Sequence, residues 1–505
     1  MLSNLVIAVI AAALFITLRR VFSKRGPTMP GPPRTPIVGN IIPTLTPWVT
    51  LAKFGEKYGP VYSLQLLMTP AIVVNSVSAA RELLESKSGV YAARHPPKMI
   101  ELSGMSPGVL FETDSNRLRK GRKLMASVLQ PKELEQYRSV LRHHTVTFLS
   151  NVVRAPEGFL AHLRNIPAGI TLEMAYGYSI QGYNDPYVKN ANTTFKNFTT
   201  ASALSVDEAF AVNWMPFLAH LPGFLPGTSF KALAETYRKQ FIGLMEEGHQ
   251  MVKTAIANGM AKESLTSKAL RENPDYDEEE IIKYTATQLY AGGSETSISS
   301  LSSFIRTMTT RPDVQKKAQE ELDRVVGHDR LPTLADRPNL PYVDAVLRET
   351  IRCFPVLPTF YRNPVEDDVY NGYHIPKGTT LLVNVWGMLH DPNVYENPHT
   401  FDPDRWLKPG VDKTDKNIDP LEIAFGFGRR LCPGKHLAVE IMFTVIASLL
   451  AVFDITKARR ECGEEITIVE EYSKGSIVGP LPFECNINPR SEKSKQLVEH
   501  AFNAL

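Results

Sequence analysis

The sequence predicts a mainly α-helical protein with a small β region, built as one large domain behind an N-terminal transmembrane helix. Helical periodicity of apolar residues dominates from residue 78 to about residue 330. Short strand-like runs occur only outside that stretch, at 61–67, 71–75 and 372–380. No change of composition divides residues 45–505, so we expect a single domain there.

The first residues form an apolar segment followed by basic residues. Residues 5–18 are apolar apart from Thr17, and Arg and Lys recur over 19–25. A cleaved signal peptide is the alternative, because a full membrane span needs roughly 20 residues. However, no positive charge precedes the segment and no small-residue cleavage site follows it. Residues 1–22 are therefore predicted to be a signal anchor that leaves the rest of the chain on the cytosolic side.

Prolines dominate the stretch after the anchor. They remove backbone donors and fix φ, so residues 23–44 are predicted to be a stiff, extended hinge before the domain at 45–505. Within that domain, cap and proline signals predict helices at 277–310, 312–327 and 341–353.

Composition excludes several classes of protein. The 505 residues carry a net charge of only +3, which gives no support for a nucleic-acid or polyanionic partner. The chain has 4 cysteines and no Cys-x-x-Cys, so neither a structural zinc site nor a disulfide scaffold is expected.

The most specific feature is the segment 425–434, with the sequence Phe-Gly-Phe-Gly-Arg-Arg-Leu-Cys-Pro-Gly. Its glycines allow the backbone to approach a flat ligand without Cβ clashes. Cys432 precedes Pro433, which suits a helix start, and a thiol there loses its proton readily to become a metal-binding thiolate. Arg430 is expected to pair with a carboxylate on the ligand, and Phe425 to shield the sulfur. A lone cysteine is more often core filler, so the prediction depends on the whole pattern.

This segment resembles the heme-binding loop of the cytochrome P450 family, Phe-x-x-Gly-x-Arg-x-Cys-x-Gly, at Phe425, Gly428, Arg430, Cys432 and Gly434. The resemblance implies heme b as cofactor, with the Cys432 thiolate as axial ligand of the iron. Such a ligand favours O–O cleavage in dioxygen. The likeness extends over essentially the whole chain and implies the family's triangular, mainly helical fold with a small sheet region.

Two adjacent glycines, Gly292 and Gly293, interrupt the helix expected at 277–310. Each costs about 1 kcal/mol relative to alanine, which invites a functional reason. The run Gly-Gly-Ser-Glu-Thr-Ser resembles the family's oxygen-activation motif. The resemblance implies that Glu295 and Thr296 deliver protons during catalysis. The alternative is a tight helix-packing site.

Glu349 and Arg352 match the family's Glu-x-x-Arg pair, and one helical turn of separation allows a salt bridge. Several other Glu/Arg pairs share this spacing, so only their order relative to the cysteine loop selects them. Arg405 resembles the third member of this structural network.

Arg119 and Arg362 are the candidates for further contacts with the heme propionates. The segment 116–123 resembles the family's Trp-Arg-x-x-Arg helix, but Leu118 stands where tryptophan is expected. The alternative for Arg119 is a solvated basic face. A docking face for a reductase, or a merely solvated surface, is expected from the following basic residues: Lys120, Arg122, Lys123 and Lys435.

The resemblance implies a monooxygenase of the endoplasmic reticulum membrane, supplied with electrons by NADPH–cytochrome P450 reductase. It would oxidise a lipophilic small molecule. Residues 218–227 resemble fungal members that act in secondary metabolism, and a terpenoid is the first expectation, ahead of an aromatic polyketide or an alkaloid. Family topology implies substrate contacts at 99–110, 202–217, 290–291, 356–360 and 475–478.

Two other functions use the same cofactor. One is a heme-thiolate isomerase or dehydratase that does not use dioxygen, and the other is a non-catalytic membrane heme sensor. The presence of Glu295 and Thr296 argues against both, because neither needs a proton relay.

Overall fold

The computed structural model describes residues 29–505, with gaps at 36–38, 43–45, 67–68, 183–184, 204–209, 408–416, 461, 470 and 474. The predicted anchor at 1–22 lies outside the described residues, as does part of the hinge at 23–44. Within them the chain is mainly helical and carries three small sheets, which confirms the predicted fold class for this part of the chain.

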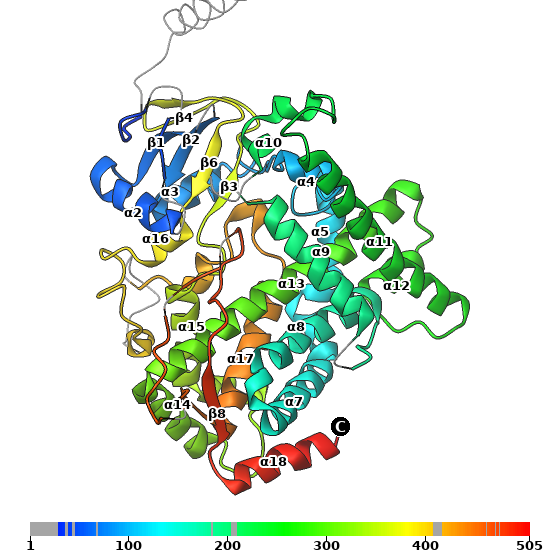
Figure 1. Cartoon of the computed structure of the whole chain (residues 1–505), viewed down its shortest axis with the longest axis vertical. Helices are drawn as coiled ribbons and strands as arrows, with labels where there is room; N and C mark the ends of the chain where they lie inside the picture. Colours follow the sequence, from blue (N-terminus) through cyan, green and yellow to red (C-terminus); the bar gives the residue numbers. More distant parts are fainter. Residues whose placement is uncertain are drawn as a thin grey trace, which may run out of the picture.

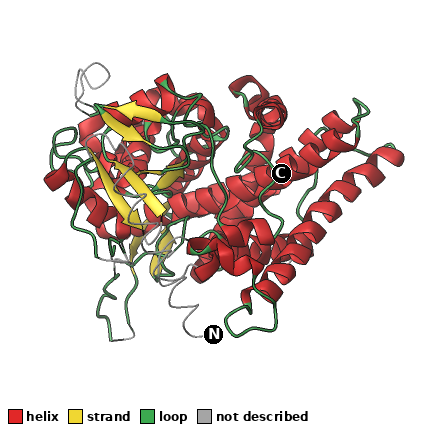
Figure 2. Ribbon diagram, turned by 90° about the horizontal axis from the view of Figure 1, so that it is seen from above, coloured by secondary structure: helices red, strands yellow, loops and turns green. Residues whose placement is uncertain are grey.

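The largest sheet lies at one side of the molecule, and helices form most of the remainder (Figures 1 and 2). Its strand order is β1-β2-β6-β3, and β2 pairs with β6 in parallel while the other neighbours are antiparallel. The strands are β1 (Val61–Leu66), β2 (Thr69–Val74), β6 (Thr380–Val383) and β3 (Phe360–Arg362). β6 thus lies between β2 and β3. It brings Arg362, the last residue of β3, into the same sheet as the N-terminal strands of the domain.

The other two sheets are hairpin-sized. β4 (Asp368–Tyr370) pairs with β5 (Tyr373–Ile375) around a turn at Asn371, whose φ of 50° is left-handed. The turn and strand pair predicted at 372–380 thus lies earlier in the chain, at 368–375, because β5 pairs with the strand before it and not with β6. β7 (Phe453–Lys457) pairs with β8 (Cys485–Pro489).

Helix α13 (Tyr276–Thr310) runs through the middle of the molecule (Figure 1). Its 35 residues span about 52 Å at 1.5 Å per residue. The Asp275 carboxylate caps its N-terminus by accepting from the Glu278 N–H, and acidic residues fill the first turn. Its end precedes Pro312, as predicted. α8 (Phe159–Tyr176) and α5 (Ser115–Leu129) pack against it.

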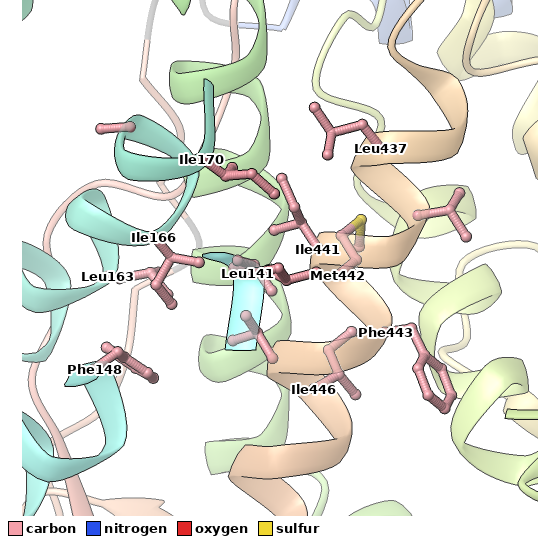
Figure 3. Packing of buried hydrophobic residues seen from close by; sticks show 14 of the residues in the cluster. Leu141, Phe148, Leu163, Ile166, Ile170, Leu437, Ile441, Met442, Phe443 and Ile446 are labelled. Carbon is pink, nitrogen blue, oxygen red and sulfur yellow. The ribbon is translucent and has the colours of Figure 1, made fainter. Parts of the chain in front are cut away.

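The main core lies between α7 (Arg138–Arg154), α8 and α17 (Lys435–Val452). Figure 3 shows side chains of α8 and α17 facing one another, among them Leu163, Ile166, Ile170, Ile441 and Ile446. In the described part of the chain, α17 is the one helix long and apolar enough to cross a membrane. It is mostly buried in this core.

The remaining helices complete the domain around this core. α14 and α15 match the helices predicted at 312–327 and 341–353, with α14 two residues shorter at its end. The bounds are α2 (Pro47–Tyr58), α3 (Val77–Arg81), α4 (Lys98–Leu102), α6 (Pro131–Leu134), α9 (Pro186–Ala201), α10 (Ala211–Trp214), α11 (Phe230–Ala257), α12 (Leu265–Leu270), α14 (Pro312–Val325), α15 (Pro341–Cys353), α16 (Val385–Leu389) and α18 (Glu492–Asn503).

Candidate functional site

The cysteine loop turns tightly just before the core helix α17. The Cys432 N–H donates to the Phe425 carbonyl oxygen at 2.9 Å, which closes the loop. α17 begins at Lys435 rather than at Pro433, because Pro433 and Gly434 form a turn first. Two residues therefore separate Cys432 from the first residue of α17. The expectation that a helix begins at Pro433, directly after the cysteine, is wrong.

The surroundings of the Cys432 thiol act on its charge in opposite directions. Burial is the largest effect and raises the pKa of the thiol above its ordinary value. A hydrogen bond from the Gly434 N–H and the positive charges of Arg122 and Lys435 act to lower that pKa. The protein alone thus favours the thiolate only in part, and a bound metal would complete the stabilisation.

Gly428 is required by packing within the protein. Its φ is 59°, and a Cβ built there would lie 1.9 Å from the Leu84 carbonyl oxygen, in the π-helical turn Glu82–Ser86. Packing against the Leu84 carbonyl thus gives Gly428 a reason that the expected approach of a flat ligand did not include. At Gly434, by contrast, the nearest atom to an added Cβ is the Cys432 Sγ, at 3.9 Å.

Four arginines gather beside the cysteine loop, and we call Arg94, Arg122, Arg362 and Arg430 the arginine cluster. Arg362 is only 2% exposed, and burial with the charges of Arg94 and Arg430 holds its pKa well below the ordinary value. Burial, together with Arg94 and Arg122, lowers the pKa of Arg430 to about 10. The Arg122 Nη1 donates to the Leu431 carbonyl oxygen at 3.0 Å, next to the cysteine.

The arginine cluster carries positive charge that forms no ion pair within the described part of the chain. Among the described residues, none of its members forms an ion pair, and the buried Arg94 Nε has no hydrogen-bond partner. Arg430 donates to the backbone carbonyls of Ala92, Val109 and Glu112 instead of to a carboxylate. Buried charges of like sign are costly unless an opposite charge joins them. A ligand with two carboxylates, such as heme with its propionates, fits this cluster.

Arg119 does not join the arginine cluster. It is exposed and donates to the Asn116 Oδ1 at 2.8 Å on its own helix, α5. Arg122, three residues later, occupies the side of α5 that faces the cysteine loop, and Leu118 is buried there as well. Arg119 thus lies on a solvated helix face, the alternative given for it, whereas Arg122, expected on the basic surface, belongs to the cluster.

Glu295 and Thr296 lie on α13 but point to different neighbours. The Glu295 carboxylate accepts from the Arg164 Nη1 of α8 at 3.1 Å. The Thr296 hydroxyl donates to the Gly292 carbonyl oxygen at 2.7 Å. Gly292 is exposed, and a Cβ built there would meet no atom within 4 Å. Gly292 and Thr296, one turn apart, therefore share an open face of the helix.

The second glycine of the pair has a packing role. A Cβ at Gly293 would lie 2.5 Å from the Thr171 Cγ2 of α8. Helix packing, one of the two explanations offered for the glycine pair, therefore accounts for Gly293. It does not account for Gly292, which leaves the functional explanation for that residue.

The structure brings Glu349, Arg352 and Arg405 together in a buried network. Arg352 donates to the Glu349 carboxylate through Nε at 2.9 Å and Nη2 at 2.8 Å, and Arg405 donates through Nε at 3.1 Å. The Trp406 Nε1 and the Asp402 N–H also donate to Glu349, each at 2.9 Å. The last two contacts were missed because neither residue stands at a diagnostic spacing.

The arginines of this network also bind backbone carbonyls of the chain that precedes the cysteine loop. The Arg352 Nη1 donates to Leu389 at 2.9 Å and to Pro398 at 2.7 Å, and the Arg405 Nη1 donates to Glu396 at 2.9 Å. The network therefore ties α15 to residues 389–406, as its proposed structural role requires.

Several segments predicted to contact substrate touch one another. The Ser476 and Ser202 hydroxyls lie 3.0 Å apart, and the Val478 N–H donates to the Val356 carbonyl oxygen at 2.8 Å. Tyr290 behaves differently, because it is 1% exposed and packs against other aromatic rings. Residues 204–209 of the predicted segment 202–217 lie outside the described residues.

Comparison with known proteins agrees with this arrangement. The cytochrome P450 family pattern matches residues 29–482. Cytochrome P450 monooxygenase 208 of Postia placenta is 38% identical over 494 residues, or 97% of this chain and 95% of the relative. Cytochrome P450 monooxygenase claR of Ampulloclitocybe clavipes is 40% identical over 481 residues, or 94% of this chain and 89% of the relative.

A solved structure supports the fold. A zebrafish cytochrome P450, determined with progesterone, superimposes with a TM-score of 0.71 at 22% identity, covering 88% of this chain and 99% of the other. The family pattern, the curated relatives and the fold lead to one conclusion. This chain belongs to the cytochrome P450 family and is a monooxygenase that uses heme held by a cysteine thiolate.

Proposed function

We propose that Cys432 is the cysteine that binds the heme iron and that the arginine cluster binds the heme propionates. The observation that carries this assignment is the position of Cys432 beside that cluster. Of the other cysteines, Cys353 is buried beside Glu349 and Arg352, Cys462 is exposed, and Cys485 lies in β8. When bound, heme with a thiolate ligand supplies dioxygen activation and favours cleavage of the O–O bond.

Thr296 and Glu295 are proposed to supply protons at the open face of α13. In the structure the Thr296 Oγ1 donates a hydrogen bond to the Gly292 carbonyl oxygen, so the hydroxyl must rotate before it can donate elsewhere. Glu295 is held by Arg164, and it must exchange this partner for water to pass a proton on. Both steps require the side chains to change partners on a helix, α13, that is continuous through this region.

The protein is proposed to sit on the endoplasmic reticulum membrane. The apolar segment at 1–22 and the basic residues that follow it support an anchor that leaves the domain on the cytosolic side of this membrane. A second apolar surface supports it independently. Phe217 is 57% exposed and Phe224 is 84% exposed, both between α10 and α11. Large exposed aromatics on one connection favour contact with lipid over contact with water.

Electrons are proposed to come from NADPH–cytochrome P450 reductase. Of the basic residues near the cysteine loop, Lys120 pairs with Glu278 at 2.8 Å and Arg122 belongs to the arginine cluster. Lys123 and Lys435 remain as the positive charges that could receive an acidic partner.

The substrate is proposed to be a lipophilic product of fungal secondary metabolism, with a terpenoid as the first expectation. The predicted contact segments 99–110 and 202–217 contribute to one apolar cluster, through Met99 and Met105 of the first and Val212 of the second. The fungal origin of the relatives and the sequence of residues 218–227 support the pathway assignment.

The test begins with the spectrum of the reduced protein under carbon monoxide. Wild type and Cys462→Ser should both show a thiolate-type Soret band, and Cys432→Ser should lose it. Absence of the band in wild type would overturn the cofactor assignment. With the band present, NADPH consumption is measured with the reductase and a panel of lipophilic substrates. Failure to oxidise any of them would favour the heme sensor.

A further inference from the structure

The amide of Gln288 holds a loop of the chain against α13. Its Oε1 accepts from the Leu110 N–H at 3.1 Å, and its Nε2 donates to the Pro107 carbonyl oxygen at 3.0 Å. The backbone partners fix the orientation of the amide, because an N–H can only donate and a carbonyl can only accept. One side chain thus satisfies a donor and an acceptor of residues 107–110, which we call the clamped loop.

Gly108 shows that the loop is shaped around this amide. Its φ is 104°, and a Cβ built there would lie 2.6 Å from the Gln288 Nε2 and 2.9 Å from its Oε1. The flat face of the amide therefore rests directly on the glycine. No other residue type allows both the backbone conformation and the approach.

Gln288 stands one helical turn before Gly292 on the same side of α13. At Gln288 that side of the helix is covered by the clamped loop, and at Gly292 it is open. The boundary between the covered and open parts of the face thus lies between these two residues.

The other side of the clamped loop is held by the arginine cluster. The Arg430 Nη1 donates to the Val109 carbonyl oxygen at 2.7 Å, and the Arg94 Nη1 donates to Leu110 at 3.4 Å. The loop is therefore a bridge between the cysteine loop and α13, and Gln288 supplies its hydrogen bonds on the α13 side. Tyr284, one turn earlier, adds a contact to the Gly104 carbonyl oxygen at 3.2 Å.

We propose that Gln288 is a positioning residue that limits the length of substrate the site accepts. By clamping residues 107–110 on α13, its amide places a wall at one end of the open face that carries Gly292 and Thr296. The proposal rests on the proposed function, since it takes that open face to be where substrate lies.

The experiment uses the full-length, heme-loaded protein and a series of N-alkylimidazoles of increasing chain length, titrated by their effect on the heme spectrum. Wild type should bind progressively longer chains more tightly and then lose affinity beyond a limiting length. In Gln288→Ala this limit should move to longer chains. The ratio of Kd values for the longest and shortest probes should fall about tenfold, a change of roughly 1.4 kcal/mol.

Gln288→Glu separates the hydrogen bonds from the volume of the side chain. Glutamate has nearly the same size and can still accept from the Leu110 N–H, but it cannot donate to the Pro107 carbonyl. The clamp predicts that it behaves like Gln288→Ala, whereas a space-filling role predicts wild-type behaviour. Hydrogen exchange gives a readout independent of the heme: both variants should exchange faster at residues 107–112 because the clamp is broken.

Gln315 provides a matched control. Its amide makes the same pair of contacts elsewhere, donating to the Ile455 carbonyl oxygen at 3.1 Å and accepting from the Ile455 N–H at 2.9 Å. Gln315→Ala should lower stability without moving the limiting chain length. The proposal is wrong if this control shifts the limit equally, or if both Gln288 variants keep the wild-type limit. Failure of the proposed function would be seen beforehand, as a missing thiolate-type Soret band in wild type.

Discussion

The carboxylate of Glu349 serves two buried guanidinium groups and an indole at once. Glu349 and Arg352 are 0% exposed and Arg405 is 3% exposed, so water cannot replace a lost partner. Removing one member of such a network leaves an uncompensated charge inside the protein. Glu349 is therefore needed for stability mainly because its removal would leave two buried positive charges without a counter-charge.

Glu349→Gln should lower the free energy of unfolding by about 3–5 kcal/mol, because both arginines lose their counter-charge. Thermal and denaturant unfolding of the heme-loaded protein would measure it. Glu246→Gln is the control, since Glu246 is half exposed and pairs with Lys283 at 2.8 Å, where solvent screens the pair. Equal effects of the two substitutions would contradict the buried-network account.

Arg122→Leu should weaken heme retention by removing one charge from the arginine cluster. Arg119→Leu, on the same helix, should leave retention unchanged, because that side chain is solvated. The rate of heme transfer to an excess of apomyoglobin distinguishes them. Faster transfer from Arg119→Leu than from Arg122→Leu would reverse the assignment.

Thr296→Ala should uncouple electron consumption from oxidation of substrate, because a proton donor at the open face is lost. The ratio of product to NADPH consumed is expected to fall several-fold while hydrogen peroxide rises. Ser297→Ala serves as the control, since the Ser297 hydroxyl makes the same contact one residue on, to the Gly293 carbonyl oxygen at 2.8 Å. A coupled Thr296→Ala enzyme would remove Thr296 from the proton path.

The Glu349 network could be predicted from the sequence, because chain order relative to the loop around Cys432 separates Glu349 and Arg352 from identical spacings elsewhere. The same spacing selected Arg119, which lies away from the arginine cluster, because spacing alone does not tell which side of a helix faces the site. The buried apolar residues Leu118, Met125 and Leu129 mark the inner side of α5, and Arg122 lies on that side. Arg94 carried no such signal, since it lies in an irregular segment that reaches the cluster only through the tertiary fold.

At the scale of elements, α13 shows how one helix meets two demands. Its glycine pair presents one residue to α8, where contact is closest, and the other to the open face. The helix could be predicted to within one residue at its start, because its cap, acidic first turn and following proline are all local signals. The start of α17 could not, because the turn at Pro433 and Gly434 depends on how the cysteine loop closes.

Gly293→Ala should destabilise the fold, because its new methyl group would overlap the Thr171 Cγ2. Adding Thr171→Ser, which removes that methyl group and keeps the hydroxyl, should restore most of the loss. Gly292→Ala meets open space and should stabilise the helix by up to about 1 kcal/mol. Unfolding of the three variants and the double mutant measures this, and failure of Thr171→Ser to rescue would contradict the packing role.

At the scale of the whole molecule, the proposed membrane contact rests on two separate features, the sequence of the N-terminal segment and the exposed aromatics between α10 and α11. The N-terminal segment was read from hydropathy and flanking charge, whereas the exposed aromatics between α10 and α11 become visible only when the fold shows which apolar residues remain outside the core. From the sequence alone, the apolar residues at 215–225 cannot be distinguished from a buried core segment.

A chain lacking residues 1–25 should therefore still bind phospholipid vesicles. Phe217→Ser with Phe224→Ser in that truncated chain should release most of it, as measured by flotation. Met260→Ser is the control, because Met260 is 72% exposed but lies beyond the far end of α11, about 42 Å along the helix. Equal release by the control would show that general surface polarity, and not this connection, determines binding.

Helix α17 imposes a constraint on how the protein is made. It follows Cys432 after the turn at Pro433 and Gly434 and is apolar enough to be mistaken for a membrane span, yet it lies in the interior of the domain. A chain made at the membrane, as the proposed localisation requires, has to keep this segment out of the bilayer, and the helices made earlier have to enclose it. Until they do, its apolar side chains are exposed to aggregation next to the cysteine proposed to bind the heme iron. Heme binding and burial of this helix are therefore expected to take place in the same late stage of folding.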